Sequence, residues 1–140
     1  MKLYIMDTDV VGFAFQQHSA VLERIRRLAE DDLLVTTIVT FGEDLSGWLP
    51  ACKRARDGAT RAEAYTRLER GLDFYRNWIC LPFDTPAAAA FERLRARKPR
   101  IGTNDLSIAA IALSVGGILV TRNIVDFQRI TELPLEDWTA

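Results

Sequence analysis

The sequence predicts an α/β fold in which a central, mostly parallel sheet is flanked by helices. Short, β-branched apolar runs alternate along the chain with longer segments of helical periodicity, a pattern typical of parallel strands connected by helices. The chain has 140 residues, and 49% of them are hydrophobic, which is enough to bury a core. No composition shift or long linker divides it, so we expect one domain over residues 1–140.

The N-terminal segment is predicted to be a strand followed by a helix. The apolar run Leu3–Met6 leads directly into Asp7-Thr8-Asp9. Thr8 or Asp9 is expected to cap a helix over Val10–Phe15, because short polar side chains accept a hydrogen bond from a free N–H of the first turn. Capping does not require three consecutive polar residues, so this segment is also a candidate binding site.

The next segments are predicted to be an amphipathic helix after Ser19 and a second strand over Leu33–Val39. Thr40 and Glu43 match the T-x-x-E capping box, in which each side chain bonds a backbone N–H at the start of a helix. Glu43 therefore has a structural explanation as well as a chemical one.

The middle of the chain is predicted to form a helical hairpin. Its first helix runs to the basic stretch Lys53–Arg56, and an amphipathic second helix spans Thr60–Asn77. Trp48, Leu49 and Tyr65 give the hairpin an apolar surface that a helix of a partner could cover.

The second half is predicted to contain two more strands, each connected by helices. Asp84 is placed to cap a helix whose first turn holds Pro86, where no intrahelical hydrogen bond is lost. Alanines keep one face of the following helix thin enough to lie on a sheet, and Gly116 ends it. The elements are a strand at Ile79–Leu81, helices over Pro86–Arg97 and Asp105–Val115, a strand at Ile118–Thr121 and a tail at Leu133–Trp138.

Four acidic residues either follow the predicted strands or open the next helices: Asp7, Glu43, Asp105 and Asp126. The carboxyl ends of parallel strands meet at one edge of the sheet. Two carboxylates about 5 Å apart repel by roughly 3 kcal/mol at an effective dielectric of 20, so a cluster needs protons or a cation. Oxygen ligands without histidine or thiolate favour Mg²⁺ or Mn²⁺. Each acid alone also has a capping explanation.

Composition excludes several other classes of site. One histidine and two cysteines without a C-x-x-C spacing provide no zinc ligand set. No apolar run approaches a membrane span and the start lacks a signal-peptide pattern, so we expect a cytoplasmic protein. The formal charge of -1 requires any nucleic-acid partner to be held by a local basic patch or through metal ions. The run Arg93–Arg100 is either a solvated helix face or such a basic rim.

Several motifs, taken together in this order, resemble PIN-domain ribonucleases of the VapC toxin type. They are Asp7-Thr8-Asp9, Thr40-x-x-Glu43 with Gly47-Trp48, Gly102-x-x-Asp105-x-x-Ile108-Ala109-Ala110, Val120-Thr121-Arg122-Asn123-x-x-Asp126-Phe127 and Glu136-Asp137-Trp138. Gly12 and Gly42 depart from the pattern, since the family often has serine at the first position and close relatives have an acid at the second.

The resemblance implies a three-layer α/β sandwich, usually a homodimer, that hydrolyses RNA with Mg²⁺ or Mn²⁺ and is neutralised by a cognate VapB-like antitoxin. It places Asp7, Glu43, Asp105 and Asp126 at the metal. We expect Asp7 and Asp105 to be direct ligands, and Glu43 and Asp126 to hold water on the ion, complete a second site or act as base. The residues expected to orient these carboxylates are Thr8, Asp9, Thr121 and Asn123.

Two alternative functions are consistent with parts of the sequence. The opening Asp7-Thr8-Asp9-Val10-Val11 also fits the D-x-D-x-V motif of haloacid-dehalogenase-type phosphatases, with Thr36 or Thr37 as the hydroxyl residue after the second strand. However, Lys98 lies at a helix end, and the later acid pair of those enzymes has no match. A non-catalytic PIN-fold module that only binds RNA or protein would typically have lost one of the four acids, and none is lost.

Overall fold

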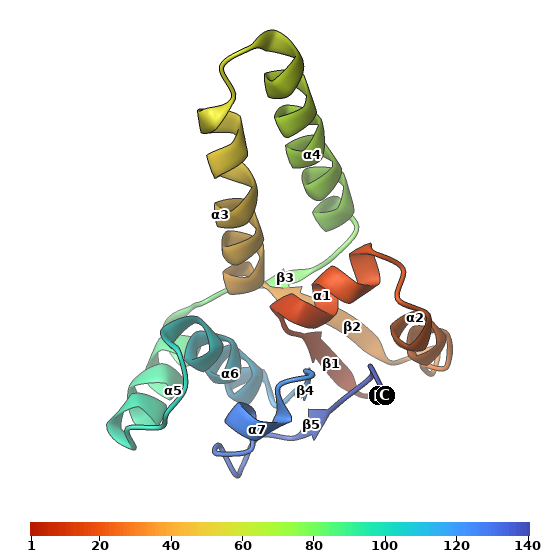
Figure 1. Cartoon of the computed structure of the whole chain (residues 1–140). Helices are drawn as coiled ribbons and strands as arrows, with labels where there is room; N and C mark the ends of the chain where they lie inside the picture. Colours follow the sequence, from red (N-terminus) through yellow and green to blue (C-terminus); the bar gives the residue numbers. More distant parts are fainter.

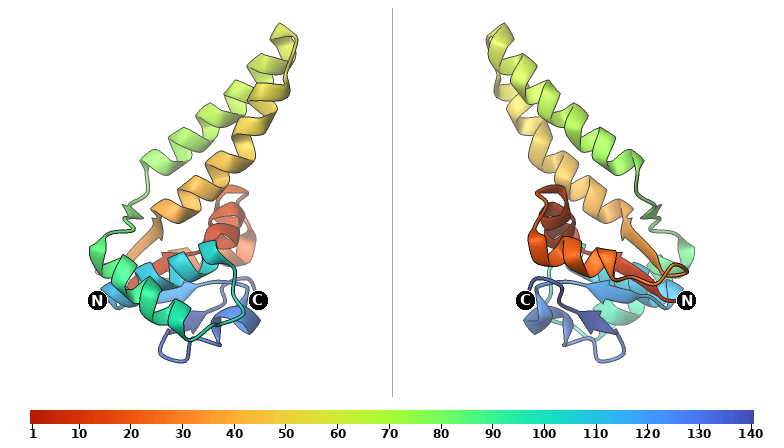
Figure 2. Two further views of the ribbon diagram at one scale, coloured as in Figure 1. Left: turned by 90° about the vertical axis from the view of Figure 1, so that its left-hand side faces the viewer. Right: turned by 90° about the vertical axis from the view of Figure 1, so that its right-hand side faces the viewer.

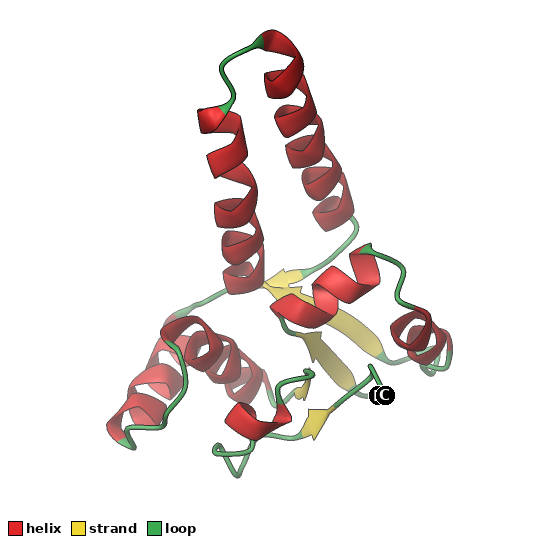
Figure 3. Cartoon of the chain, in the orientation of Figure 1, coloured by secondary structure: helices red, strands yellow, loops and turns green.

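The computed structural model describes residues 1–140 and contains five strands and seven helices (Figures 1 and 3). The strands are β1 (Leu3–Met6), β2 (Leu33–Thr37), β3 (Cys80–Leu81), β4 (Ile118–Val120) and β5 (Leu135–Glu136). The helices are α1 (Thr8–Phe15), α2 (Ser19–Arg26), α3 (Ile38–Arg54), α4 (Gly58–Arg76), α5 (Thr85–Ala96), α6 (Thr103–Val115) and α7 (Ile124–Phe127). No helix combines the length and the apolar character that crossing a membrane requires.

The strands form one sheet in the order β3-β2-β1-β4-β5, and every neighbouring pair is parallel. Because side chains alternate between the two faces of a strand, β1 packs against helices on both sides. Ile5 contributes to a buried cluster with α5 and α6, whereas Tyr4 and Met6 contribute to a second cluster with α1 and α2. The predicted sandwich of a sheet between two helical layers is confirmed.

The predicted helical hairpin is also confirmed: α3 and α4 run side by side and project well beyond the sheet (Figure 2). Trp48 of α3 packs closely against Gly71 of α4, where an added Cβ would be 2.3 Å from the indole ring. Nearer the sheet, the Tyr75 hydroxyl donates to the Asp44 carboxylate at 2.5 Å. The inner half of the hairpin is therefore fixed by close packing and by a hydrogen bond.

Two predicted helix starts are wrong. The cap of α1 is Asp7 itself, which accepts from the N–H of Val10, and not Thr8 or Asp9. The extended backbone of β2 ends at Thr37, which caps α3 by accepting from the N–H of Thr40, so the predicted capping box does not form. The side chain of Glu43 is left free for another role.

The C-terminal tail also differs from its prediction, because part of it forms β5 and extends the sheet beside β4. Trp138 then buries its ring against Tyr4 with centroids 5.3 Å apart, and its indole N–H donates to Glu136. The predicted end of α6 is correct: Gly116 has φ +67°, a conformation that glycine adopts without a steric penalty.

Candidate active site

The centre of the candidate site lies at the carboxyl end of β1, between β2 on one side and β4 on the other. Such a point, where connections leave a parallel sheet in opposite directions, forms a crevice between the loops. The backbone N–H of Asp7 donates to the carbonyl of Val120 at 3.0 Å, which extends the pairing of β1 with β4 by one residue. The first predicted acid is therefore positioned by the sheet itself.

The Asp7 side chain is only 4% exposed and is held by two donors. One carboxylate oxygen accepts from the N–H of Val10 at 3.0 Å, and the other accepts from the Thr121 hydroxyl at 2.6 Å. Burial raises the pKa of Asp7 to about 6, and nearby Asp9 and Asp105 add to this effect, although both hydrogen bonds oppose it. The predicted supporting role of Thr121 is thus consistent with its contact.

Glu43 reaches the same crevice from the first turns of α3. Its carboxylate accepts from the Thr8 hydroxyl at 2.6 Å, and that hydroxyl lies 3.2 Å from the hydroxyl of Thr40. Thr8, predicted to orient a carboxylate, therefore connects α1 to α3. The contribution of Thr40 was missed, because the sequence pattern suggested a capping role for it.

Asp105 occupies the first turn of α6 and is half-buried. No side chain caps this helix, whose N-cap residue is Gly102, so capping does not explain why an acid stands here. Burial raises the pKa of Asp105, and the charges of Glu43, Asp126 and Asp9 raise it further. These acids are close enough to repel one another.

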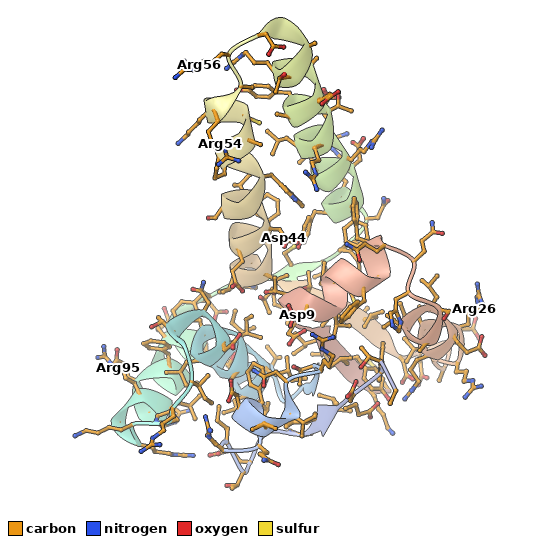
Figure 4. The ribbon with its side chains drawn as sticks, viewed as in Figure 1. Asp9, Arg26, Asp44, Arg54, Arg56 and Arg95 are labelled. Carbon is orange, nitrogen blue, oxygen red and sulfur yellow. The ribbon has the colours of Figure 1, made fainter.

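A cavity of about 250 Å³ joins these groups, and it contains no hydrophobic lining residue. It is lined by Asp7, Thr8, Asp9, Glu43, Asp105 and Asn123. Figure 4 shows Asp9 at the start of α1, beside the inner end of the hairpin. Three of the four predicted acids are therefore brought together, and Asp9 adds a fourth carboxylate to the lining.

Asp126 lies at the margin and does not line this cavity. Its two carboxylate oxygens are engaged by Arg129 at 3.1 Å and by the side-chain amide of Asn123 at 2.9 Å. Arg129 was missed by the sequence analysis; its only signal is its position three residues after Asp126 on a helical segment. Asn123 both lines the cavity and holds Asp126.

The donor set fits Mg²⁺ or Mn²⁺, since it consists of carboxylate, hydroxyl and amide oxygens with no nitrogen or sulfur ligand. No three acidic side chains converge tightly enough to surround one ion by themselves. Mg²⁺ is commonly bound by one or two carboxylates and several waters, so this spacing is compatible with it. That Asp7 and Asp105 hold such an ion directly stays a prediction.

Comparison with known proteins agrees with this arrangement. The PIN domain family profile matches residues 4–133. The chain belongs to the PIN-domain family. It is 32% identical to Ribonuclease VapC1 of Haemophilus influenzae strain R2866, over 98% of each chain. It is 26% identical to the tRNA(fMet)-specific endonuclease VapC of Shigella flexneri, over 99% of this chain and 100% of that protein.

A solved structure confirms that the resemblance extends to the fold. The structure of VapBC-1 from nontypeable Haemophilus influenzae superposes with a TM-score of 0.77 at 26% identity, covering 99% of each chain. The hairpin, the parallel sheet and the C-terminal strand of this PIN domain thus belong to an architecture shared over its full length.

The buried Asp7 makes the metal-free stability of this PIN domain depend on pH. Its pKa in the fold is about 6 against an ordinary 3.8, so the folded state binds the proton more tightly than the unfolded state. The resulting stabilisation is complete below pH ~4 and is lost as the pH rises through ~6. Urea unfolding in EDTA is expected to show a gain of about 2 kcal/mol between pH ~7.5 and ~4.5 in the wild type relative to Asp7→Asn. Equal pH dependence of the two proteins would contradict the burial of a titrating Asp7.

Proposed function

We propose that the protein is an endoribonuclease that requires Mg²⁺ or Mn²⁺ and acts as the toxin of a toxin–antitoxin pair. The observation that carries the proposal is the polar cavity that Asp7, Glu43 and Asp105 line together, without a basic residue in the lining. Such a cluster is stabilised by a divalent cation. The similarity to Ribonuclease VapC1 supports RNA as the substrate.

In this proposal some residues of the chain hold the ion, and another accepts a proton from the attacking water. A bound Mg²⁺ stabilises the charge that develops on the phosphodiester and lowers the pKa of water. Asp7 and Asp105 hold the ion, and Val10 and Thr121 fix the orientation of Asp7. Glu43, oriented by Thr8, is proposed to accept the proton of the attacking water.

Asp126 is proposed to act from the edge of the site. Its pairing with Arg129 and Asn123 holds it beside Asp105, whose pKa it raises, but outside the cavity lining. This position suits a group that orients water around the ion. It does not suit a direct ligand in this side-chain arrangement.

Chelation tests the proposed reaction. The purified protein is expected to cleave single-stranded or looped RNA with millimolar Mg²⁺ or Mn²⁺, and to lose this activity in EDTA and regain it when metal is added back. Electrophoresis of an end-labelled RNA measures the cleavage. Full cleavage in EDTA would overturn the requirement for a metal.

The phosphatase alternative is disfavoured by the contacts of the two threonines it needs. The Thr36 hydroxyl is buried and donates to the carbonyl of Met6, and Thr37 caps α3. Neither hydroxyl faces the acidic cavity, and Lys98 is exposed at the end of α5. Hydrolysis of p-nitrophenyl phosphate without RNA cleavage would revive that alternative.

A VapB-like antitoxin is the proposed partner, because the similar Haemophilus protein was solved as a VapBC complex. A surface for it lies between α1 and the hairpin, where Phe15, Trp48 and Phe74 line a cavity of about 280 Å³ with Arg67 and Arg70. Phe15 is 44% exposed in the isolated chain. The exposed part of Phe15 is therefore available to an apolar helix of the partner.

Affinity purification from the native host tests this partnership. We expect a small protein encoded beside the toxin gene to be retained and to suppress RNA cleavage, and light scattering to report the homodimer that the resemblance implies. Replacing Phe15 by Ser is expected to weaken the complex more than tenfold, since about 2 kcal/mol or more is typical for an aromatic interface anchor. Recovery of the toxin alone, fully active in extract, would contradict the proposal.

A further inference from the structure

The hairpin carries a group of basic residues that form no salt bridge with a carboxylate. Of the 18 basic residues in the chain, six lie between positions 53 and 70, against three acidic residues in the same segment. These six are Lys53, Arg54, Arg56, Arg61, Arg67 and Arg70. The arginines that form salt bridges with side-chain carboxylates all lie elsewhere, and they are Arg24, Arg26, Arg27, Arg76, Arg95, Arg97 and Arg129.

The basic run on α5 provides a direct comparison. Arg95 pairs with Glu92 at 2.6 Å, and Arg97 forms two hydrogen bonds of 2.7 Å with Glu132. The run that the sequence suggested as a basic rim is thus partly neutralised within the protein. The hairpin run keeps its charge available for a partner.

Of these six basic residues, only Arg61 donates a side-chain hydrogen bond. Basic side chains are favoured at the C-terminus of a helix, where the last carbonyls lack partners. Lys53 and Arg54 stand in the last turn of α3, but the carbonyls there accept from Arg61, which donates to Cys52 and Ala55 at 3.1 and 3.4 Å. Arg54 and Arg56 extend outward from the end of the hairpin, away from α4 (Figure 4).

The basic tip and the acidic cavity are connected by a single helix. Glu43 and Arg54 both belong to α3, and eleven residues at 1.5 Å each separate them by about 16 Å along the helix axis. Arg67 and Arg70 occupy the interval, since they line both the cavity next to Ala51 and Thr60 and the cavity next to Phe15 of α1. Exposed basic groups therefore recur from the tip toward α1, the helix that begins at the site.

We propose that Lys53, Arg54 and Arg56 form an RNA-backbone arm, which binds phosphates of the substrate strand beyond the cleavage site. The inference rests on the proposed ribonuclease function. A chain of formal charge -1 with an acidic site repels RNA unless a local patch offsets the repulsion. Guanidinium and ammonium groups bind phosphates without reading the bases, so the arm supplies affinity and register rather than sequence preference.

A matched pair of triple variants tests the arm. The arm variant is Lys53→Gln, Arg54→Gln, Arg56→Gln. The control removes the same charge from α5 and the residues just after it, as Arg93→Gln, Arg95→Gln, Lys98→Gln. Fluorescence anisotropy in EDTA measures binding of labelled, unstructured RNAs of about 20 and about 4 nucleotides, at a series of salt concentrations. Thermal melts establish that both variants are folded.

The arm variant is expected to bind the long RNA more than tenfold more weakly at low salt. The slope of log affinity against log salt should fall by about 2, since three phosphate contacts contribute roughly 0.7 each for a single strand. Cleavage of the short RNA in Mg²⁺ should be reduced much less than cleavage of the long RNA, because few of its phosphates can extend as far as the tip. The control should bind both RNAs as the wild type does.

Other outcomes would contradict either the RNA-backbone arm or the proposed ribonuclease function, and they distinguish the two. Equal salt slopes for the arm variant and the wild type would overturn the arm, even if both cleave RNA. The arm would also be overturned if its variant bound RNA normally but no longer co-purified with a small protein, since the patch would then serve a protein partner. A wild type that binds RNA through the arm but cleaves none would instead overturn the proposed function.

Discussion

Asp7→Asn is expected to reduce RNA cleavage by more than a hundredfold in kcat/KM. The substitution removes the charge of a proposed direct ligand, and a metal ion contributes several kcal/mol of transition-state stabilisation, at about 1.4 kcal/mol per factor of ten. The fold should survive, because asparagine is as good an N-cap as aspartate and can still accept from the N–H of Val10. Single-turnover cleavage of a labelled RNA measures the loss.

Asp31→Asn is the matched control, since it removes the same charge from an exposed residue just before β2, at the opposite edge of the sheet. It should cleave RNA at the wild-type rate. If Asp7→Asn retained more than a tenth of the activity while remaining folded, Asp7 would be excluded as a ligand.

Mg²⁺ is expected to stabilise the wild type by about 2.7 kcal/mol at a hundredfold excess over its dissociation constant, a rise in Tm of roughly 8 °C for a domain of this size. Asp105→Asn should lose most of this gain. Without metal, the variant should melt at the same temperature as the wild type or higher, because the substitution relieves repulsion from Glu43, Asp126 and Asp9. Calorimetry with EDTA and with millimolar Mg²⁺ gives all four melting temperatures.

A lower melting temperature of Asp105→Asn without metal would instead indicate that Asp105 has a purely structural role. An acid that only stabilises the start of α6 through the helix dipole would cost about 0.3–1 kcal/mol when neutralised. In that case the variant would melt below the wild type without metal, and both proteins would respond to Mg²⁺ equally. Such a result would remove Asp105 from the site.

The general position of the site follows from the sequence, because it depends on strand order and parallel pairing more than on the contacts of individual side chains. Apolar runs ending in Asp7 and in Thr121 are enough to place both residues at one sheet edge. The capping motifs were less reliable, since Thr37 and Thr40, which lie three residues apart, are both residues that can cap the start of α3. The start of α3 is decided by where β2 stops pairing with β3, at Thr37, which is a tertiary contact.

Sequence patterns did not predict the features that depend on the direction of a side chain. Asp126 has the spacing of a ligand, but its contacts with Arg129 and Asn123 turn it to the margin of the cavity. The two basic runs look alike in sequence, and the pairing of Arg97 with Glu132, which lies 35 residues away, is visible only in the fold. β5 was missed because two residues are too few to give a periodicity.

The contacts of Asp7 and Glu43 also determine how much of the site must become ordered when an ion binds. Val10 and Thr121 already fix the rotamer of Asp7, and Thr8 fixes that of Glu43, so folding itself has immobilised both side chains. Fixing a free carboxylate side chain costs up to about 2 kcal/mol of conformational entropy, and preorganised ligands avoid this cost. An ion bound as proposed would therefore have mainly Asp105 to immobilise, and it could dissociate and return while the rest of the site keeps its shape.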